Sequence, residues 1–212
     1  MLLNALEKWL KQHLPEIAAD LNPGVDEHLL DTFSRRLNAP LPDAFKALYR
    51  WHNGQRMAIH SGPWYGLSFL TLEQVIKELD DWQSVIAGLP SEELREMNAT
   101  MSSTPPGFVK CEYSNPLWIP FAYDYGGNYL GIDLAPGMKG HYGQVINFGR
   151  DEKRKIAVAP DLNSFIMWML KELKLGNVNI REEEDGGRSF NTLHPEKYHF
   201  LDSLAGMFPA QK

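Results

Sequence analysis

The sequence predicts an α+β fold, and two observations lead to this prediction. Apolar residues recur at helical spacing through most of the first 100 residues and again over residues 161–175. Between them, over residues 108–159, short β-type runs alternate with Gly, Pro and Asn. Because the connections between these runs are short, we expect antiparallel pairing. The chain has 212 residues, 43% of them hydrophobic, which is enough for one principal core.

Three helices are predicted in the first quarter of the chain. Apolar residues at helical spacing mark the first of them, over residues 2–17. Asp26, after an Asn-Pro-Gly break, is placed to cap the second. Pro42 suits the first turn of the third, and Gly54 is placed to end it in a left-handed conformation. The segment 57–69, rich in Gly and aromatic residues, is expected to supply one or two strands.

The clearest local signal is the start of a fourth helix. Thr71 and Gln74 form a capping box ahead of a long apolar stripe, and we expect this helix to cover the sheet. A short helix and then a polar connection are expected over residues 89–104. Asp161 is placed to cap a last strong helix, and Gly176 to stop it.

The strand-forming region also contains the only cysteine. The five predicted strands are residues 108–113, 117–123, 128–134, 144–148 and 155–159. Cys111 falls in the first of them and is expected to be a small core residue. A single cysteine excludes an intramolecular disulfide framework, which fits a reducing compartment.

The predicted organisation is a single domain over residues 1–176, followed by an extension over residues 177–212. The extension has a charged, linker-like segment at 181–189, acidic over Glu182–Asp185, and a short helix at 195–208. No segment has the apolar run of a signal peptide or a membrane span. We therefore expect a cytoplasmic protein that does not bind a membrane.

The charge pattern disfavours nucleic acid as a partner. The formal net charge is −6, so nothing in the overall balance favours binding to a phosphate backbone. Residues 73–96 contain seven acidic and two basic residues. This run is interpreted either as a solvated helix face or as a docking surface for a basic partner.

The segment 118–134, WIPFAYDYGGNYLGIDL, is the clearest candidate for a site. Asp124 and Asp133 would suit a catalytic carboxylate pair, a metal loop or a plain β-hairpin. A calcium loop starting at Asp124 would need a closing Glu where Ala135 stands, so no metal is predicted. Neither a phosphate-binding glycine motif nor a nucleophile elbow is present, so no cofactor and no catalytic residue are predicted.

A hairpin explains this segment with the fewest assumptions. Trp118 and Pro120 lead its first strand, and Gly126 and Gly127 suit its turn. Asp124 can accept hydrogen bonds from the backbone of that turn. The predicted structural signature consists of Trp118, Pro120, Gly126 and Gly127.

The order of segments resembles a known superfamily. The stretches LPDAFKALYRWHNGQ, WYGLSFLTLEQVIKELDDWQ, WIPFAYDYGGNYLGIDLAPGMKGHYGQVINF and VAPDLNSFIMWMLKEL follow one another in the chain. Over about residues 25–175 this order resembles the SUKH superfamily, specifically its Smi/Knr-type cell-wall-assembly-regulator branch. The resemblance implies a curved antiparallel sheet flanked by helices, and a non-enzymatic role.

The resemblance also implies a function. Bacterial members of the superfamily resemble immunity proteins that neutralise secreted polymorphic toxins, whereas eukaryotic relatives regulate cell-wall synthesis. The first hypothesis is therefore a bacterial immunity protein whose partner is a cognate toxin. The alternatives are a regulator or scaffold of the cell-wall type, and a ligand-binding or enzymatic domain that uses Asp124, Asp133 and His141 in a cleft of the sheet.

Aromatic and acidic residues near predicted loops are the candidates for partner binding, because Tyr and Trp are common anchors of protein interfaces. These candidates are Trp64, Tyr65, Asp124, Tyr125, Tyr129, Asp133 and Tyr142.

Overall fold

The computed structural model describes residues 2–182 and 187–209. The helices in these residues are α1 (Leu2–His13), α2 (Pro15–Asp20), α3 (Glu27–Leu37), α4 (Asp43–Trp51), α5 (Leu72–Gly88), α6 (Ser91–Ala99), α7 (Leu162–Lys174) and α8 (Phe200–Met207). The strands are β1 (Ser68–Phe69), β2 (Ser102–Thr104), β3 (Trp118–Tyr123), β4 (Asn128–Asp133), β5 (Gln144–Gly149), β6 (Arg154–Ala159), β7 (Asn179–Glu182) and β8 (Arg188–Asn191). Within the described ranges, no helix is both long and apolar enough to cross a bilayer.

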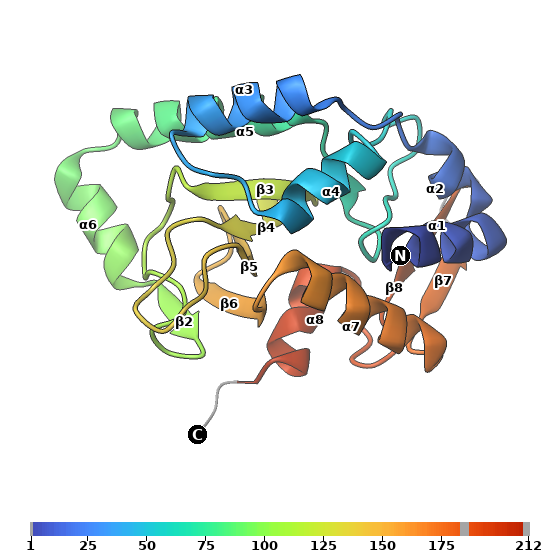
Figure 1. The fold of residues 1–212 in the computed structure, drawn as a ribbon. Coiled ribbons are helices and arrows are strands. Elements are labelled where there is room, and N and C mark those ends of the chain that lie inside the picture. Colours follow the sequence, from blue (N-terminus) through green and yellow to red (C-terminus); the bar gives the residue numbers. More distant parts are fainter. Residues whose placement is uncertain (1, 183–186, 210–212) are drawn as a thin grey trace.

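One open sheet, in the order β1-β3-β4-β5-β6-β2, forms the centre of the molecule. All its pairs are antiparallel except β2–β6, which is parallel. In Figure 1 the sheet lies between α3 and α5 on one side and α7 and α8 on the other. The central strands β4 and β5 are buried along their whole length, as expected for a sheet covered on both faces. This architecture confirms the predicted α+β class.

Three helices begin at the N-cap residues that the sequence predicts. The Thr71 side chain accepts a hydrogen bond from the Gln74 N–H at 3.2 Å, and Gln74 Oε1 accepts one from the Thr71 N–H at 2.8 Å. Asp161 and Asp26 cap α7 and α3 in the same way, through the N–H groups of Ser164 and Leu29. These caps satisfy backbone donors that the first helical turn leaves unpaired.

The opening helical pattern forms two helices instead of one. Pro15 is the first residue of α2, a position where its missing N–H costs no helical hydrogen bond. The same residue would remove a hydrogen bond from the interior of a continuous helix. Leu10 and Ile17, one on each helix, remain buried in the common core.

The strand predicted at residues 108–113 is wrong. The Phe108 carbonyl accepts hydrogen bonds from the Gly137 N–H at 2.9 Å and from Gln144 Nε2 at 2.8 Å. This carbonyl is therefore bound by a loop and by a side chain, and not by the backbone of a neighbouring strand. Cys111 is exposed, which also corrects its predicted place in the core. The strand that joins the sheet here is β2, in the segment interpreted as a polar connection.

The segment 118–134 is a β-hairpin. Asp124 Oδ1 accepts hydrogen bonds from the Gly126 N–H at 2.6 Å and the Asn128 N–H at 2.9 Å. Tyr125 and Gly127 take positive φ angles of 64° and 90° in the turn. Trp118 and Pro120 lie buried on β3, where Trp118 pairs with Asp133 of β4. The turn chemistry predicted for Asp124 is confirmed.

The segment after α7 contains a second hairpin where the sequence suggested a linker. β7 and β8 pair from Asn179↔Asn191 to Glu182↔Arg188. The rest of the predicted acidic linker, residues 183–185, lies outside the described residues. Phe190 and three residues of α8 (Phe200, Leu201 and Leu204) are buried in the same core cluster as the sheet.

Candidate functional site

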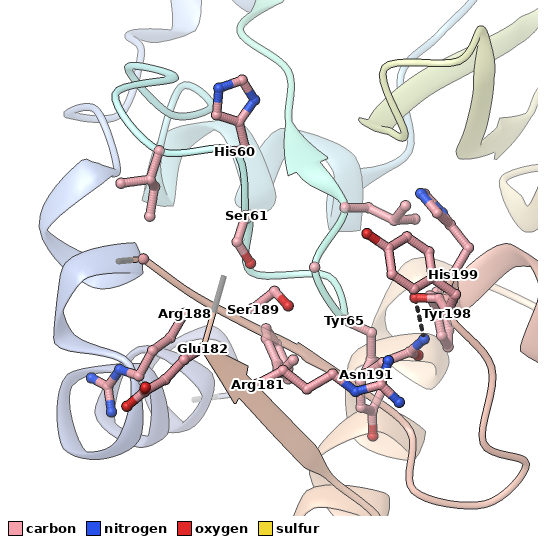
Figure 2. A pocket seen from close by; sticks show the side chains of 16 residues that line it. His60, Ser61, Tyr65, Arg181, Glu182, Arg188, Ser189, Asn191, Tyr198 and His199 are labelled. Carbon is pink, nitrogen blue, oxygen red and sulfur yellow. Dashed lines mark hydrogen bonds between the residues drawn. The ribbon is translucent and has the colours of Figure 1, made fainter. Parts of the chain in front are cut away.

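A cavity of about 750 Å³ lies between segments that are far apart in the sequence (Figure 2). Residues 59–67 form one wall, and β8 with the end of β7 forms another. Residues 198–200, which lead into α8, contribute Tyr198 and His199. The cavity therefore exists only because the β7–β8 hairpin packs near the loop that precedes β1.

The loop wall depends on a tight turn at residues 62–66. The Gly62 N–H donates to the Gly66 carbonyl at 3.1 Å, while Tyr65 and Gly66 adopt positive φ angles of 51° and 86°. A Cβ added to Gly66 would lie 3.0 Å from the Phe190 carbonyl oxygen of β8. A side chain there would be strained by the positive φ and would press on the hairpin.

Aromatic rings join the walls. The ring of Tyr65 stacks on Phe200 at 4.9 Å and packs against Phe190 at 5.4 Å, measured between ring centroids. Burial raises the pKa of the Tyr65 phenol far above its usual value, so this side chain stays neutral. Tyr65 thus acts as a rigid support for the cavity.

Ion pairs connect the hairpin to other elements. The Arg188 guanidinium donates two hydrogen bonds to the Glu16 carboxylate of α2, at 2.7 and 2.8 Å. This contact lowers the pKa of Glu16 below its usual value. Arg181 pairs with Glu196 at 3.0 Å. Two basic residues of the cavity lining are therefore already neutralised by carboxylates.

The end of the cavity carries an exposed aromatic ring. Asn191 Nδ2 donates to the carbonyls of Lys197 at 2.9 Å and of Tyr198 at 3.3 Å, a contact drawn in Figure 2. These bonds hold the backbone of Tyr198 against the hairpin. Its side chain is nevertheless 82% exposed. A large ring is thus presented to solvent on an ordered backbone.

A second exposed tyrosine lies beside the same cavity. The Tyr125 ring, 46% exposed, packs against the ring of His60, a lining residue, at 5.5 Å. Its hydroxyl accepts a hydrogen bond from Ser68 Oγ at 2.9 Å and lies 3.2 Å from the Met57 sulfur. The cavity and its rim therefore include Tyr125 and Tyr198 as ordered aromatic groups.

The arrangement offers recognition chemistry. Among the described residues, no cluster of His, Cys, Asp or Glu could hold a metal ion. Ser61 Oγ, in the lining, is buried and has no hydrogen-bond partner in the described part of the chain, so no base is positioned to activate it. Aromatic rings, backbone groups and paired charges are what the cavity presents.

The structure places the seven partner-binding candidates in different environments. Trp64, Tyr65, Tyr129 and Asp133 are buried, so their side chains do not form an exposed surface. Asp124 is half-buried, and Tyr125 and Tyr142 are each 46% exposed. Of these two exposed tyrosines, only Tyr125 lies beside the cavity, because the Tyr142 hydroxyl donates to the Pro40 carbonyl at 2.6 Å, next to α4.

The two candidate carboxylates do not converge. The Asp124 N–H donates to the Asn128 carbonyl at 3.2 Å, which places Asp124 beside the start of β4, whereas Asp133 ends this strand. About five residue steps of roughly 3.4 Å therefore separate their backbones. Asp133 accepts hydrogen bonds from the Ala135 N–H and from Gln144 Nε2, both at 2.9 Å. Burial raises the pKa of Asp133 above its usual value. Each carboxylate serves its own turn, which counts against the catalytic-pair and cleft hypotheses.

Sequence reasoning missed the residues that form the cavity. His60, Arg181, Arg188 and Tyr198 were not singled out. The segment around Phe190 was interpreted as a linker because of its charges, although two short runs with an apolar residue between polar ones flank that charged stretch. Those two runs were the sequence signal that could have predicted the strands β7 and β8.

Comparison with known proteins shows which proteins this chain resembles. The model of the SMI1 / KNR4 family (SUKH-1) matches residues 24–168. A KNR4/SMI1 homolog 2 from Debaryomyces hansenii is 33% identical, over 88% of this chain and 37% of its own length. The cell wall assembly regulator SMI1 of Saccharomyces cerevisiae is 28% identical, over 85% of this chain and 41% of its own. A glucan synthesis regulatory protein of Neurospora crassa is also 28% identical, over 84% and 39%.

These relatives overturn the first functional hypothesis. They are fungal proteins, and those whose names state a function are regulators of the cell wall or of glucan synthesis. The expectation of a bacterial immunity protein with a toxin partner is therefore wrong. The superfamily resemblance was correct, but it did not by itself decide between the two branches. This chain spans about two-fifths of the length of these relatives.

Proposed function

Because the chain belongs to the SMI1 / KNR4 family (SUKH-1), we propose that it is a non-catalytic regulatory domain that acts in cell-wall assembly by binding a protein partner. The names of its relatives support the regulatory role. The cavity between the β7–β8 hairpin and the loop at residues 59–67 supports the binding role. The partner contacts this cavity and its rim.

The observation that carries the binding role is the pair of exposed tyrosines at the cavity. Tyr198 and Tyr125 expose large parts of their rings while other groups fix their positions. Rings of this kind lose little conformational entropy when they are covered, which makes tyrosine a frequent anchor of protein interfaces. Tyr142 remains a candidate elsewhere on the surface.

The character of the lining favours a protein over a charged small molecule. Arg181 and Arg188 are held by carboxylates, so a phosphate or carboxylate ligand would have to displace Glu196 or Glu16. A protein segment needs no such exchange, since it can use the rings and the backbone groups of the wall. The partner therefore needs no strong charge at this site.

Organisation and location complete the proposal. Residues 1–176 form the principal domain, and the extension after it supplies the hairpin wall of the cavity. The single cysteine suits a reducing compartment, so we place the protein in the cytoplasm, with neither nucleic acid nor a membrane as its partner.

A chimera tests the regulatory role. This chain would replace the matching segment of the cell wall assembly regulator SMI1 in Saccharomyces cerevisiae, and wall glucan and growth under wall stress would be measured. We expect the chimera to restore both. A chimera that accumulates in folded form and restores neither would contradict the regulatory role.

Tyrosine variants of that chimera test the site. We expect the double change Tyr125→Ala with Tyr198→Ala to abolish restoration, because it removes both rings at the cavity. Tyr142→Ala is the matched control, since Tyr142 has the same exposed fraction as Tyr125 but contacts Pro40, whereas Tyr125 packs against His60 of the lining. Full restoration by the double variant would exclude the cavity as the binding site.

A further inference from the structure

Helix α5 carries an apolar stripe that is longer than the part it buries. Leu72 and Val75, near its start, are the buried residues of the helix. Leu79, Trp82 and Ile86 continue the stripe at helical spacing and are only partly buried. The next helix, α6, is described along its whole length and buries none of its residues. The second half of the α5 stripe therefore has no complete cover.

This uncovered stripe forms one wall of a groove of about 310 Å³. Trp118 and Pro120 of β3 and Phe148 of β5 contribute to the opposite side. The rings of Trp118 and Phe148 pack at 5.6 Å, so the side formed by the sheet is rigid. This groove is separate from the cavity at β7–β8, and the two share no lining residue.

A hydrogen-bonded chain fixes the polar edge of the groove. The Tyr129 hydroxyl donates to a carboxylate oxygen of Glu78 at 2.5 Å, and Trp82 Nε1 donates to the Tyr129 oxygen at 3.3 Å. Burial and this carboxylate raise the pKa of Tyr129, which keeps the phenol protonated as a donor. Glu78 is thus held at the groove beside the ring of Trp82.

Charges near the groove are incompletely balanced. Lys77, Arg36 and Arg95 pair with Asp81, Asp80 and Glu92 respectively. Glu78 on α5 and two residues of α6, Glu93 and Glu96, take part in none of the ion pairs between described residues. Among the described residues that line the groove, Glu78 is the only charged one, so the groove is complementary to a segment that is apolar and basic.

We propose that this groove binds a segment of a partner protein in which a large apolar side chain is flanked by Lys or Arg. The apolar side chain packs between Trp82 and Ile86 on α5 and the rings of the sheet. The basic residues face Glu78 and the acidic surface of α6. The volume matches one or two side chains, at the lower end of the range for ligand pockets. The inference does not depend on the role of the cavity at β7–β8.

Selection from random peptides tests this inference. Short peptides displayed on phage would be selected on the immobilised full chain, and the enriched peptides would be labelled with fluorescein for anisotropy titration. We expect enriched peptides to combine a large apolar residue with Lys or Arg, and their affinity to fall as salt is raised. Enrichment of acidic or purely polar peptides would overturn the proposal.

Two neighbouring residues of α5 supply the matched variants. Ile86→Asp places a charge in the groove and should weaken binding about tenfold, whereas Val85→Asp alters a residue that is 52% exposed and outside the lining. Ala87→Arg, at an exposed position of the lining, is the second groove variant if Ile86→Asp lowers the melting temperature. Equal affinities for the wild type, a folded groove variant and Val85→Asp would refute the site.

Discussion

Two β-hairpins of the molecule, β3–β4 and β7–β8, are held in different ways. The β3–β4 hairpin is stabilised locally, because Asp124 accepts hydrogen bonds from residues two and four positions further along the chain. The β7–β8 hairpin is held by distant partners: Arg188 binds Glu16, which is 172 positions away. The first belongs to the central sheet, whereas the second forms a wall of the cavity.

The difference between local and long-range contacts shows which contacts form the candidate site in this fold. In the first hairpin, the Asp124 carboxylate is satisfied by its own turn and is not free to bind anything else. The second hairpin is anchored to Glu16 of α2, and the cavity lies between this hairpin and the loop at residues 59–67. The acidic pair that first resembles a site is therefore structural, while the apparent linker contributes to the candidate site.

The largest effect should come from the buried aromatic residue of the first hairpin. Trp118→Ala should lower the free energy of unfolding by about 3 to 5 kcal/mol, because it leaves a cavity inside the sheet. Phe190→Ala in the second hairpin should cost toward the lower end of this range, since β8 lies outside the sheet. Urea unfolding would measure both values, and a greater loss for Phe190→Ala would reverse the comparison.

A buried carboxyl group near the first hairpin should make the stability of the protein depend on pH. Burial raises the pKa of Glu152, next to the β3–β4 turn, from 4.5 to about 7. The folded state then binds more protons at Glu152 than the unfolded state does between these values. The contribution of Glu152 to stability is therefore complete below pH 4.5 and is lost as pH rises to 7. One pKa unit corresponds to about 1.4 kcal/mol, so the loss has an upper limit of about 3 kcal/mol.

Glu152→Gln should flatten this fall in stability, which urea unfolding at a series of pH values would measure. Asp133→Asn is measured in parallel, because burial also raises the pKa of Asp133 above its usual value and this carboxyl contributes a fall of the same sign. Stability that rises between pH 4.5 and 7 in the wild type would contradict the assigned direction.

The turn of the first hairpin should show a smaller effect. Asp124→Ala removes acceptors for the Gly126 and Asn128 N–H groups and for the Asn128 side chain, and should cost about 1 to 2 kcal/mol. Asp124→Asn keeps one acceptor oxygen and should cost less. Thermal unfolding would rank the three proteins. An Asp124→Ala protein as stable as the wild type would show that the turn does not depend on its own carboxylate.

The smallest effect should appear at the ion pair that holds the second hairpin. Arg188→Ala should raise the pKa of Glu16, because the guanidinium is the main cause of its lowered value. A titration of the Glu16 side chain by NMR would measure this change, with Arg181→Ala as the control because Arg181 pairs with Glu196. A Glu16 pKa that stays low in Arg188→Ala would remove this contact as the anchor of the hairpin.

The features predicted correctly from the sequence depend on contacts between near neighbours. Thr71 with Gln74, Asp161 with Ser164 and Asp124 with Gly126 each lie within three positions, so the residue types and their spacing determine the geometry. These contacts set the helix starts and the turn of the main hairpin. Together with the order of segments, they were sufficient for the fold class and the superfamily.

The features that were missed depend on contacts between distant residues. β2 joins the sheet through parallel pairing with β6, about 50 positions later, which no local pattern indicates. The cavity likewise requires Gly66 beside Phe190 and Arg188 beside Glu16. A short charged segment has the composition of a linker, and the residues that it contacts in the folded chain are too distant in the sequence to reveal that it is ordered.

Site-specific photo-crosslinking tests most directly whether a partner protein binds at the cavity. A photoreactive phenylalanine analogue would replace Tyr198 in the chimera, and Tyr142 in a parallel chimera, in living cells. The account predicts a discrete covalent adduct with one protein from position 198, lost in the presence of Tyr125→Ala, and no such adduct from position 142. The absence of an adduct at position 198, or the same adduct from both positions, would contradict it.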